Sequence, residues 1–437
     1  MREDGLKRDF VRYAAYNICG MIGLSCYVLA DTFFISLRLG VKGLTALNLA
    51  IPVYDLVHGC GLMFGMGGAA KYAVYREQGE TERADQCFSR SLCAMAGVAV
   101  FFVAAGLFLS GRLTALLGAD DEVFRMTKTY LRVILVCSPA FMANDVLLCF
   151  VRNDGNPGLS MAAMLTGSIS NIVLDYVFLF PLAMGMLGAV SATALAPVIS
   201  ICVLSRHRVT KRNQFHFVRG RSSPGMTGKI ISLGLPSLVT EAASGIVMLF
   251  FNFLVLNAQG NIGVAAYGVI ANLSLVVASV HTGIAQGMQP ILSRVCGQGD
   301  RKGMGRLLRY AVTTTLILSG CIYVFLLAAA DAVVGAFNRE QSAKLQEIAV
   351  TGLKLYFLAA PFAGFNVVAS AYFMSTERAL PAQAVSTSRG FIVILPMAFL
   401  MSRLLKMEGI WLSYPMTECL VAMMAMLLCK RASAKGR

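Results

Sequence analysis

The chain has 437 residues, of which 57% are hydrophobic and 14% charged, and its mean hydropathy is +0.67. Soluble globular domains carry about 25% charged residues, so this composition excludes an ordinary soluble domain, a disordered tail and a disulfide scaffold. The net charge of +15 suits nucleic acid only if a folded domain presents a basic face. The alternative is that the basic residues lie in loops on one side of a membrane.

Apolar stretches long enough to span a membrane recur along the whole chain. Because about 20 apolar residues cross the hydrocarbon core, we predict twelve helices, at 13–37, 44–70, 89–110, 129–151, 158–182, 186–205, 230–257, 262–290, 308–330, 347–375, 380–402 and 408–429. The charged opening 1–12, and Asp31 within the first stretch, indicate a retained span and not a removed signal peptide. The expected fold class is therefore an all-α polytopic membrane protein.

The positions of the basic residues predict the orientation. Most Lys and Arg residues lie in the two terminal segments and the even-numbered loops, and segment 206–229 has no acid beside its basic residues Arg206, Arg208, Lys211, Arg212, Arg219, Arg221 and Lys229. Cytoplasmic loops are enriched in such residues, so we expect both termini in the cytoplasm. We interpret the basic segment as a topology signal with weak attraction to anionic lipid, and we do not expect a nucleic-acid partner.

The two halves of the chain resemble each other at an offset of about 220 residues. Gly40, Gly43 and Ala46 return as Gly260, Gly263 and Ala266. We therefore predict an N-lobe at 1–205, a linker at 206–229 and a C-lobe at 230–437. Each repeat has six spans, so the repeats are parallel, and a substrate site is expected between them near the membrane midplane. This organisation is typical of a transporter.

Six acids fall within predicted spans: Asp31, Asp55, Asp145, Asp175, Glu241 and Glu418. Each costs about 2.5–3.5 kcal/mol at a helix centre. Asn171 and Asp175 are four residues apart and share one helix face. Asp31 and Thr193 can join them if the first, fifth and sixth helices pack together. Such a group suits a proton or Na⁺; the alternative is a satisfied polar patch between helices.

The other intramembrane polar residues receive weaker assignments. Glu241 has no charged partner near it in the sequence and is a candidate for substrate binding or a second protonation. Asp55, Asp145 and Glu418 are at least as well explained by structural roles. We expect His58 and His281 to hydrogen bond to backbone, with a proton relay as the minor alternative. Asn144, Asn366 and Gln286 are further candidates for a polar cavity. Since no nucleophile–base or metal-ligand spacing occurs, we do not expect an enzyme.

At this point the chain resembles the multidrug and toxic compound extrusion (MATE) family, bacterial branch. The resemblance is carried by Ala30 to Ser36 with Leu39 and Gly40, Gly155-Asn156-Pro157, Asn171 to Phe178, Gly283 to Pro290 with Gly297 and Gly299, Arg389, and Gly409 to Pro415. It implies twelve helices in two lobes, and export of organic cations against H⁺ or Na⁺ by rocking of the lobes in a bacterial inner membrane.

The resemblance also implies roles for particular residues. Asp31, Asn171, Asp175 and Thr193 match the family's N-lobe cation site, where H⁺ or Na⁺ would bind without any other cofactor. Glu241 matches a seventh-helix acid of a subset that also has an acid in the tenth helix. This chain has no acid between Lys354 and Glu377, which favours the N-lobe site. We expect a monomer whose partners are small organic cations and the lipid bilayer.

Two other functions remain open at this stage. One is a flippase for lipid-linked saccharides from the same superfamily, which would favour several arginines in the cavity for pyrophosphate; the predicted spans hold Arg132, Lys354 and Arg389. The other is an uncoupled channel or a membrane receptor, which would leave the acidic group in the N-lobe unexplained.

Overall fold

The computed structural model describes residues 3–219, 225–338 and 342–434, and within them it contains helices and no strand. The first half of the chain forms α1 (Glu3–Glu77), α2 (Thr81–Ala104), η1 (Ala105–Leu109), α3 (Ser110–Leu116), α4 (Asp121–Val136), α5 (Ser138–Asn153), α6 (Pro157–Leu179) and α7 (Met186–Val209). Helices suit a chain of this composition because each satisfies its own backbone hydrogen bonds, which hydrocarbon cannot do.

The second half repeats this pattern of long and interrupted helices. It forms α8 (Met226–Gly297), α9 (Arg301–Ala328), α10 (Ala330–Phe337), α11 (Ala343–Tyr356), η2 (Phe357–Ala359), α12 (Ala360–Ser375), α13 (Ala379–Thr387), η3 (Ser388–Ile392) and α14 (Ile394–Ala434). Short π-helical or 3₁₀ segments join neighbouring helices into single spans, as η2 joins α11 to α12. Such irregular turns are tolerated in membrane helices when neighbouring helices satisfy the freed backbone groups.

Three helices are long enough to cross a membrane twice, and each folds back at one break. The breaks are Gly40 in α1 (φ 63°, ψ −154°), Gly260 in α8 (φ 64°, ψ −155°) and Lys406 in α14 (φ 51°, ψ −124°). A positive φ is easiest for glycine, and the matching angles at Gly40 and Gly260 agree with the repeat seen in the sequence. We call the part of each helix before its break the first arm and the part after it the second arm.

The predicted fold class, an all-α membrane protein with twelve spans, is confirmed. Among the described residues, eight apolar helical stretches are long enough to cross a membrane, and α4 with α5, bent by 50° at the break between them, makes a ninth. Because three of these stretches fold back on themselves, the chain crosses twelve times. The fourth span extends beyond the predicted 129–151, since α4 begins at Asp121, where Asp120 caps its N-terminus by accepting from the Val123 N–H.

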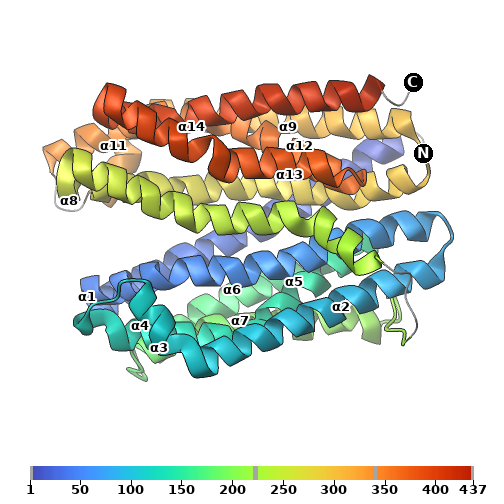
Figure 1. Ribbon diagram of the computed structural model, residues 1–437, viewed down its shortest axis with the longest axis horizontal. Coiled ribbons are helices and arrows are strands. Elements are labelled where there is room, and N and C mark those ends of the chain that lie inside the picture. Colours follow the sequence, from blue (N-terminus) through green and yellow to red (C-terminus); the bar gives the residue numbers. More distant parts are fainter. Residues whose placement is uncertain (1–2, 220–224, 339–341, 435–437) are drawn as a thin grey trace.

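The helices form two bundles that lie side by side (Figure 1), α1–α7 in the first bundle and α8–α14 in the second. Both chain ends lie at the same end of the molecule, which we call the terminal end; the breaks in α1, α8 and α14 lie at the opposite, kinked end. One segment departs from this division. The first turns of α1, from Leu6 to Ala14, pack in an apolar cluster with α8, α9 and α12 of the second bundle.

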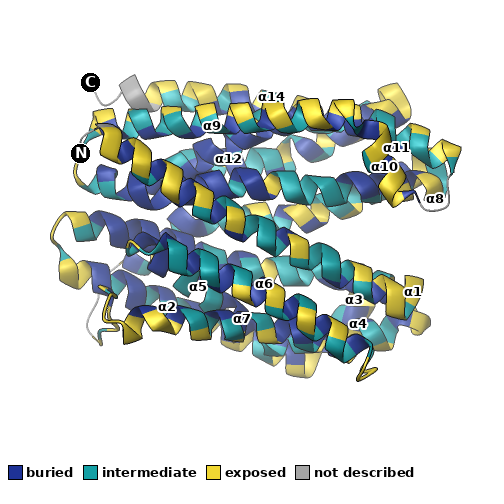
Figure 2. Ribbon diagram, turned by 180° about the vertical axis from the view of Figure 1, so that it is seen from behind, coloured by how far each residue is buried: buried dark blue, intermediate teal, exposed yellow. Residues whose placement is uncertain are grey.

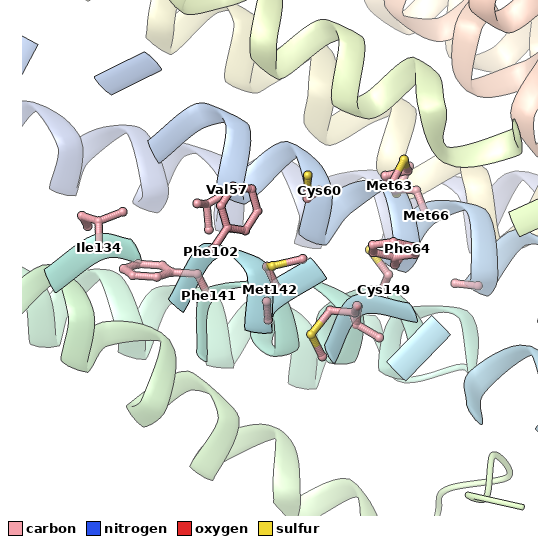
Figure 3. Packing of buried hydrophobic residues seen from close by; sticks show 14 of the residues in the cluster. Val57, Cys60, Met63, Phe64, Met66, Phe102, Ile134, Phe141, Met142 and Cys149 are labelled. Atoms are coloured by element: carbon pink, nitrogen blue, oxygen red, sulfur yellow. The ribbon is translucent and has the colours of Figure 1, made fainter. Parts of the chain in front are cut away.

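Apolar residues cover both the interior and the outside of the molecule. Figure 2 shows exposed residues along the outer faces of the helices, and among them are the apolar side chains of Val100, Phe101, Phe108, Ile317 and Phe325. Such an outer surface is compatible with lipid and not with water. Inside the first bundle, methionine, cysteine and aromatic side chains of α1, α2 and α5 pack in one cluster with Ile134 of α4 (Figure 3).

The predicted linker between the bundles is described by the structure on both sides of residues 220–224. α7 continues to Val209 and α8 begins at Met226, so helices occupy both ends of the predicted linker 206–229. Residues 213–219, which we call the strap, run across the terminal end of the first bundle, where Phe215 is buried against Phe88, Phe150 and Tyr72. Residues 220–224 of the linker, among them Arg221, lie outside the described residues.

Candidate functional site

The four residues predicted to form a cation site do come together. Asp31 lies on the first arm of α1, Asn171 and Asp175 lie on α6, and Thr193 lies on α7; all four are buried, with at most 6% of each residue exposed. The carboxyl groups of Asp31 and Asp175 are within hydrogen-bonding reach of each other. A hydrogen bond between two carboxyl groups requires a proton on one of them, so this pair is arranged to share one.

The side-chain amide of Asn171 can form hydrogen bonds through both its nitrogen and its oxygen in only one of its two orientations. In that orientation its nitrogen donates to Asp175 Oδ2 at 3.0 Å, and its oxygen accepts from the backbone N–H of Thr193 at 3.2 Å. An amide orientation is assigned from its hydrogen bonds, and the opposite one would place oxygen against oxygen. The amide oxygen therefore points away from the two carboxyl groups. The group supplies fewer oxygen ligands to a Na⁺ ion than the sequence suggested, and it remains well suited to a proton.

Two carboxyl oxygens in this group are left open. Asp31 Oδ1 and Asp175 Oδ1 are buried and have no hydrogen-bond partner among the described residues. Buried polar atoms are almost always paired, so each exception calls for an explanation. The Thr193 hydroxyl donates to its own helix, at Ala189 O (3.1 Å), and its side chain also hydrogen bonds to Tyr130 of α4. Tyr130 is a member of this group that the sequence analysis did not identify.

Glu241 belongs to a different cluster, at the contact between the two bundles. It lies on the first arm of α8 and packs directly against the second arm of α1, where a Cβ added to Gly59 would lie 3.1 Å from Glu241 Cβ. The neighbouring His58 has its Nδ1 2.9 Å from Asp145 Oδ2 of α5. The expectation that His58 bonds to backbone is therefore wrong, because its partner is a carboxylate 87 positions away in the sequence.

Glu418, the other intramembrane acid of the second bundle, is neutralised within its own bundle. Arg389 Nη2 of η3 lies 2.7 Å from Glu418 Oε1 of α14, and Asn366 Nδ2 donates to Glu418 Oε2 at 2.7 Å. Glu418 is 1% exposed. Asn366, one of the predicted cavity residues, therefore hydrogen bonds to the acid of a structural ion pair. His281 bonds to the Ser319 hydroxyl (2.9 Å) and not, as expected, to backbone.

Gln286 is committed to a contact near the terminal end. Arg152 of α5, although 2% exposed, bonds through Nη1 to Gln286 Oε1 of α8 (2.5 Å) and to Asn17 Oδ1 of α1 (2.7 Å). The predicted fourth span 129–151 stops one residue before Arg152, whereas α5 continues through it. Asn144 has a buried Oδ1 with no partner among the described residues, and the structure assigns it no contact with the Asp31–Asp175 group.

Comparison with known proteins agrees with this architecture. The family model MatE matches residues 18–177 and 236–400. The multidrug export protein MepA of Staphylococcus saprophyticus is 24% identical over 427 residues, covering 96% of this chain and 93% of its own length. Among solved structures, a MATE protein in complex with MaL6 has a TM-score of 0.92 at 23% identity, covering 98% of this chain and 97% of its own.

A transporter of the MOP superfamily from Pyrococcus furiosus has a TM-score of 0.91 at 23% identity, covering 99% of this chain and 97% of its own. At these identities the structural matches establish the fold, and the family model establishes membership over most of both repeats. The chain is a multi-pass membrane protein that belongs to the MATE family of transporters.

Proposed function

We propose that this protein exports organic cations from the cytoplasm in exchange for protons, and that the protons bind at Asp31 and Asp175. The observation that carries the proposal is the pair of buried carboxyl groups in hydrogen-bonding reach, each with one open oxygen. Carboxyl groups this close in a low dielectric do not both ionise readily. Taking up and releasing a proton is the change of state that such a pair makes most easily.

Protons suit this group better than Na⁺. A Na⁺ ion needs several oxygen ligands, and here the Asn171 amide directs its nitrogen, and not its oxygen, at Asp175. In the second bundle Glu418 is held by Arg389, and Glu241 lies apart from it, at the contact with α1. The coupling ion that we propose is therefore H⁺, bound in the first bundle.

Transport follows if the space between the bundles opens alternately at the terminal end and at the kinked end. We propose that the terminal end faces the cytoplasm of a bacterial inner membrane, consistent with the basic residues near it. Protonation of the pair changes its charge, and only a differential affinity of protons and substrate for the two arrangements can link one flux to the other. The methionine-rich packing beside the second arm of α1 (Figure 3) supplies adaptable apolar surfaces for varied substrates. The MepA relatives are named as multidrug export proteins, which supports the same substrate class.

The test is efflux of ethidium from proteoliposomes under a pH gradient or a Na⁺ gradient, each imposed alone. We expect the pH gradient to drive efflux and the Na⁺ gradient to fail. Asp31→Asn and Asp175→Asn preserve shape but cannot exchange a proton, so each should abolish gradient-driven efflux. Asp331→Asn, at an exposed acid of α10, is the matched control. Unchanged efflux in both site variants would refute the proposed coupling site.

A further inference from the structure

His58 lies on the second arm of α1 between an acid of its own bundle and an acid of the opposite bundle. On one side its Nδ1 is 2.9 Å from Asp145 Oδ2 of α5. On the other side Glu241 of α8 packs against the adjacent Gly59. Asp55 lies one turn earlier on α1, where a Cβ added to Gly245 of α8 would lie 3.1 Å from Asp55 Oδ2. All three acids act electrostatically on the imidazole.

Glycines make this close arrangement possible. Gly59 and Gly61 lie on opposite sides of His58 in the packing: Gly59 faces Glu241 of α8, and Gly61 faces Asp145 and Met142 of α5. Because neither has a side chain, helices from both bundles approach the α1 backbone directly at this level. The Tyr54 ring stacks on His58 with centroids 6.1 Å apart and planes 7° apart, which fixes the orientation of the imidazole.

The cluster is only partly enclosed by protein. The side chain of Asp145 is 5% exposed and that of His58 is 21% exposed, while Asp55 and Glu241 are half-buried. Histidine is the side chain whose ordinary charge change falls between about pH 5 and 8. An imidazole surrounded by carboxylates on a partly accessible helix face can therefore gain or lose a proton during a transport cycle.

Asp145 and Glu241 respond differently when the bundles move relative to each other. His58 and Asp145 both belong to the first bundle and stay together, whereas Glu241 moves with the second bundle. If the bundles separate at this level, the imidazolium keeps its ion pair with Asp145 and loses the attraction of Glu241. The proton occupancy of His58 thereby depends on the distance between the bundles, and by linkage the proton in turn favours the arrangement that keeps Glu241 against α1.

We propose that His58 and Asp145 form a second proton-binding site at the contact between the bundles. Glu241, on the other side of that contact, makes the proton occupancy of this site depend on the distance between the bundles. The ligand is a proton: on release, the Nδ1–H bond of the imidazolium breaks and the proton passes to water, with no other bond changed. The site is separate from Asp31–Asp175 and rests on the proposed function only in requiring that the bundles move relative to each other.

The first experiment observes the imidazole directly. The chain has four histidines, so the full protein with ¹⁵N-labelled histidine in nanodiscs gives few imidazole signals, assigned by single His→Gln variants. We expect the protonation midpoint of His58 to shift in Asp145→Asn and, by a smaller amount, in Glu241→Gln. The signal of His281, which bonds to a hydroxyl, should stay unchanged. A His58 midpoint in Glu241→Gln equal to that of the parent would overturn the proposal.

The second experiment separates this site from the coupling pair. In proteoliposomes, His58→Gln should alter the pH dependence of ethidium efflux, whereas the matched control His281→Gln should keep the parent profile. If His58→Gln keeps the parent profile while Asp31→Asn abolishes efflux, the second site is wrong and the proposed function stands. If instead Asp31→Asn and Asp175→Asn leave efflux unchanged while the His58 midpoint shifts as expected, the proposed coupling site fails and the second site stands.

Discussion

At the scale of single residues, two sets of membrane-buried acids are neutralised in different ways. Glu418 is paired with a guanidinium and an amide of its own bundle, which fixes its charge. Among the described residues the group of Asp31 and Asp175 contains no basic side chain, and the two carboxyl groups lie within hydrogen-bonding reach of each other, so their charge depends on a proton. A buried charge without a partner is costly; the first arrangement therefore stabilises the fold, and the second can respond to pH.

Breaking the Arg389–Glu418 pair should destabilise the second bundle. Removing one partner leaves the other as an uncompensated buried charge, so Arg389→Ala and Glu418→Ala should each cost about 3–5 kcal/mol of unfolding free energy. Replacing both by apolar residues of similar size, Arg389→Met with Glu418→Leu, should restore most of this loss. Trp411, the only tryptophan in the sequence, is 1% exposed in the same bundle, and its fluorescence reports thermal unfolding. Arg403→Ala, at an exposed site on α14, is the control; equal stability of all these variants would contradict the structural role.

The sequence was informative where neighbours in space are also neighbours along a helix. Asn171 and Asp175 are four apart, and helix geometry alone predicts their shared face. The partners of His58 and Glu418 could not be predicted in this way, because the pairing of His58 with Asp145 depends on how α1 packs against α5. For the same reason the contacts of Arg152 with Asn17 of α1 and Gln286 of α8 could not be predicted.

At the scale of elements, the strap is held by alternate residues. The backbone N–H groups of Gln214, His216 and Val218 donate to Asp154 Oδ2 (2.8 Å), Asp85 Oδ1 (2.9 Å) and Ser89 Oγ (2.9 Å). An extended chain presents alternate residues to one side, so a single face of the strap is fixed to the first bundle.

Replacing Phe215, the buried aromatic residue of the strap, should release the strap from the first bundle. Phe215 is 8% exposed in an aromatic cluster, whereas Phe217, two residues further on, is 53% exposed. Truncation of a buried phenylalanine typically costs about 3–5 kcal/mol, so Phe215→Ala should undock the strap, and Phe217→Ala should leave it in place. Hydrogen–deuterium exchange of residues 213–219 measures the difference. Equally fast exchange in the parent and in Phe215→Ala would show that the docking does not hold in solution.

At the scale of the whole molecule, several polar contacts join the bundles toward the terminal end. Lys71 Nζ of α1 lies 2.6 Å from Glu377 Oε1, and Gln298 Nε2, directly after α8, donates to Glu77 Oε2 at 2.8 Å. Gly67 of α1 and Gly234 of α8 allow the two helices to touch backbone to backbone in the same region. The arrangement described is therefore closed at the terminal end, and an alternating-access cycle requires these contacts to break.

Locking the terminal end should stop transport. In a background without the native cysteines, Lys71→Cys with Glu377→Cys, joined by a short, reducible bifunctional thiol reagent, should abolish ethidium efflux, and reduction should restore it. The matched control is Arg76→Cys with Gln214→Cys, whose native side chains also meet (Arg76 Nη2 to Gln214 Oε1, 2.8 Å) but lie within the first bundle. Its cross-link spans no moving contact, so efflux should continue. Continued efflux after complete cross-linking of the 71–377 pair would mean that the bundles do not separate at this end during transport.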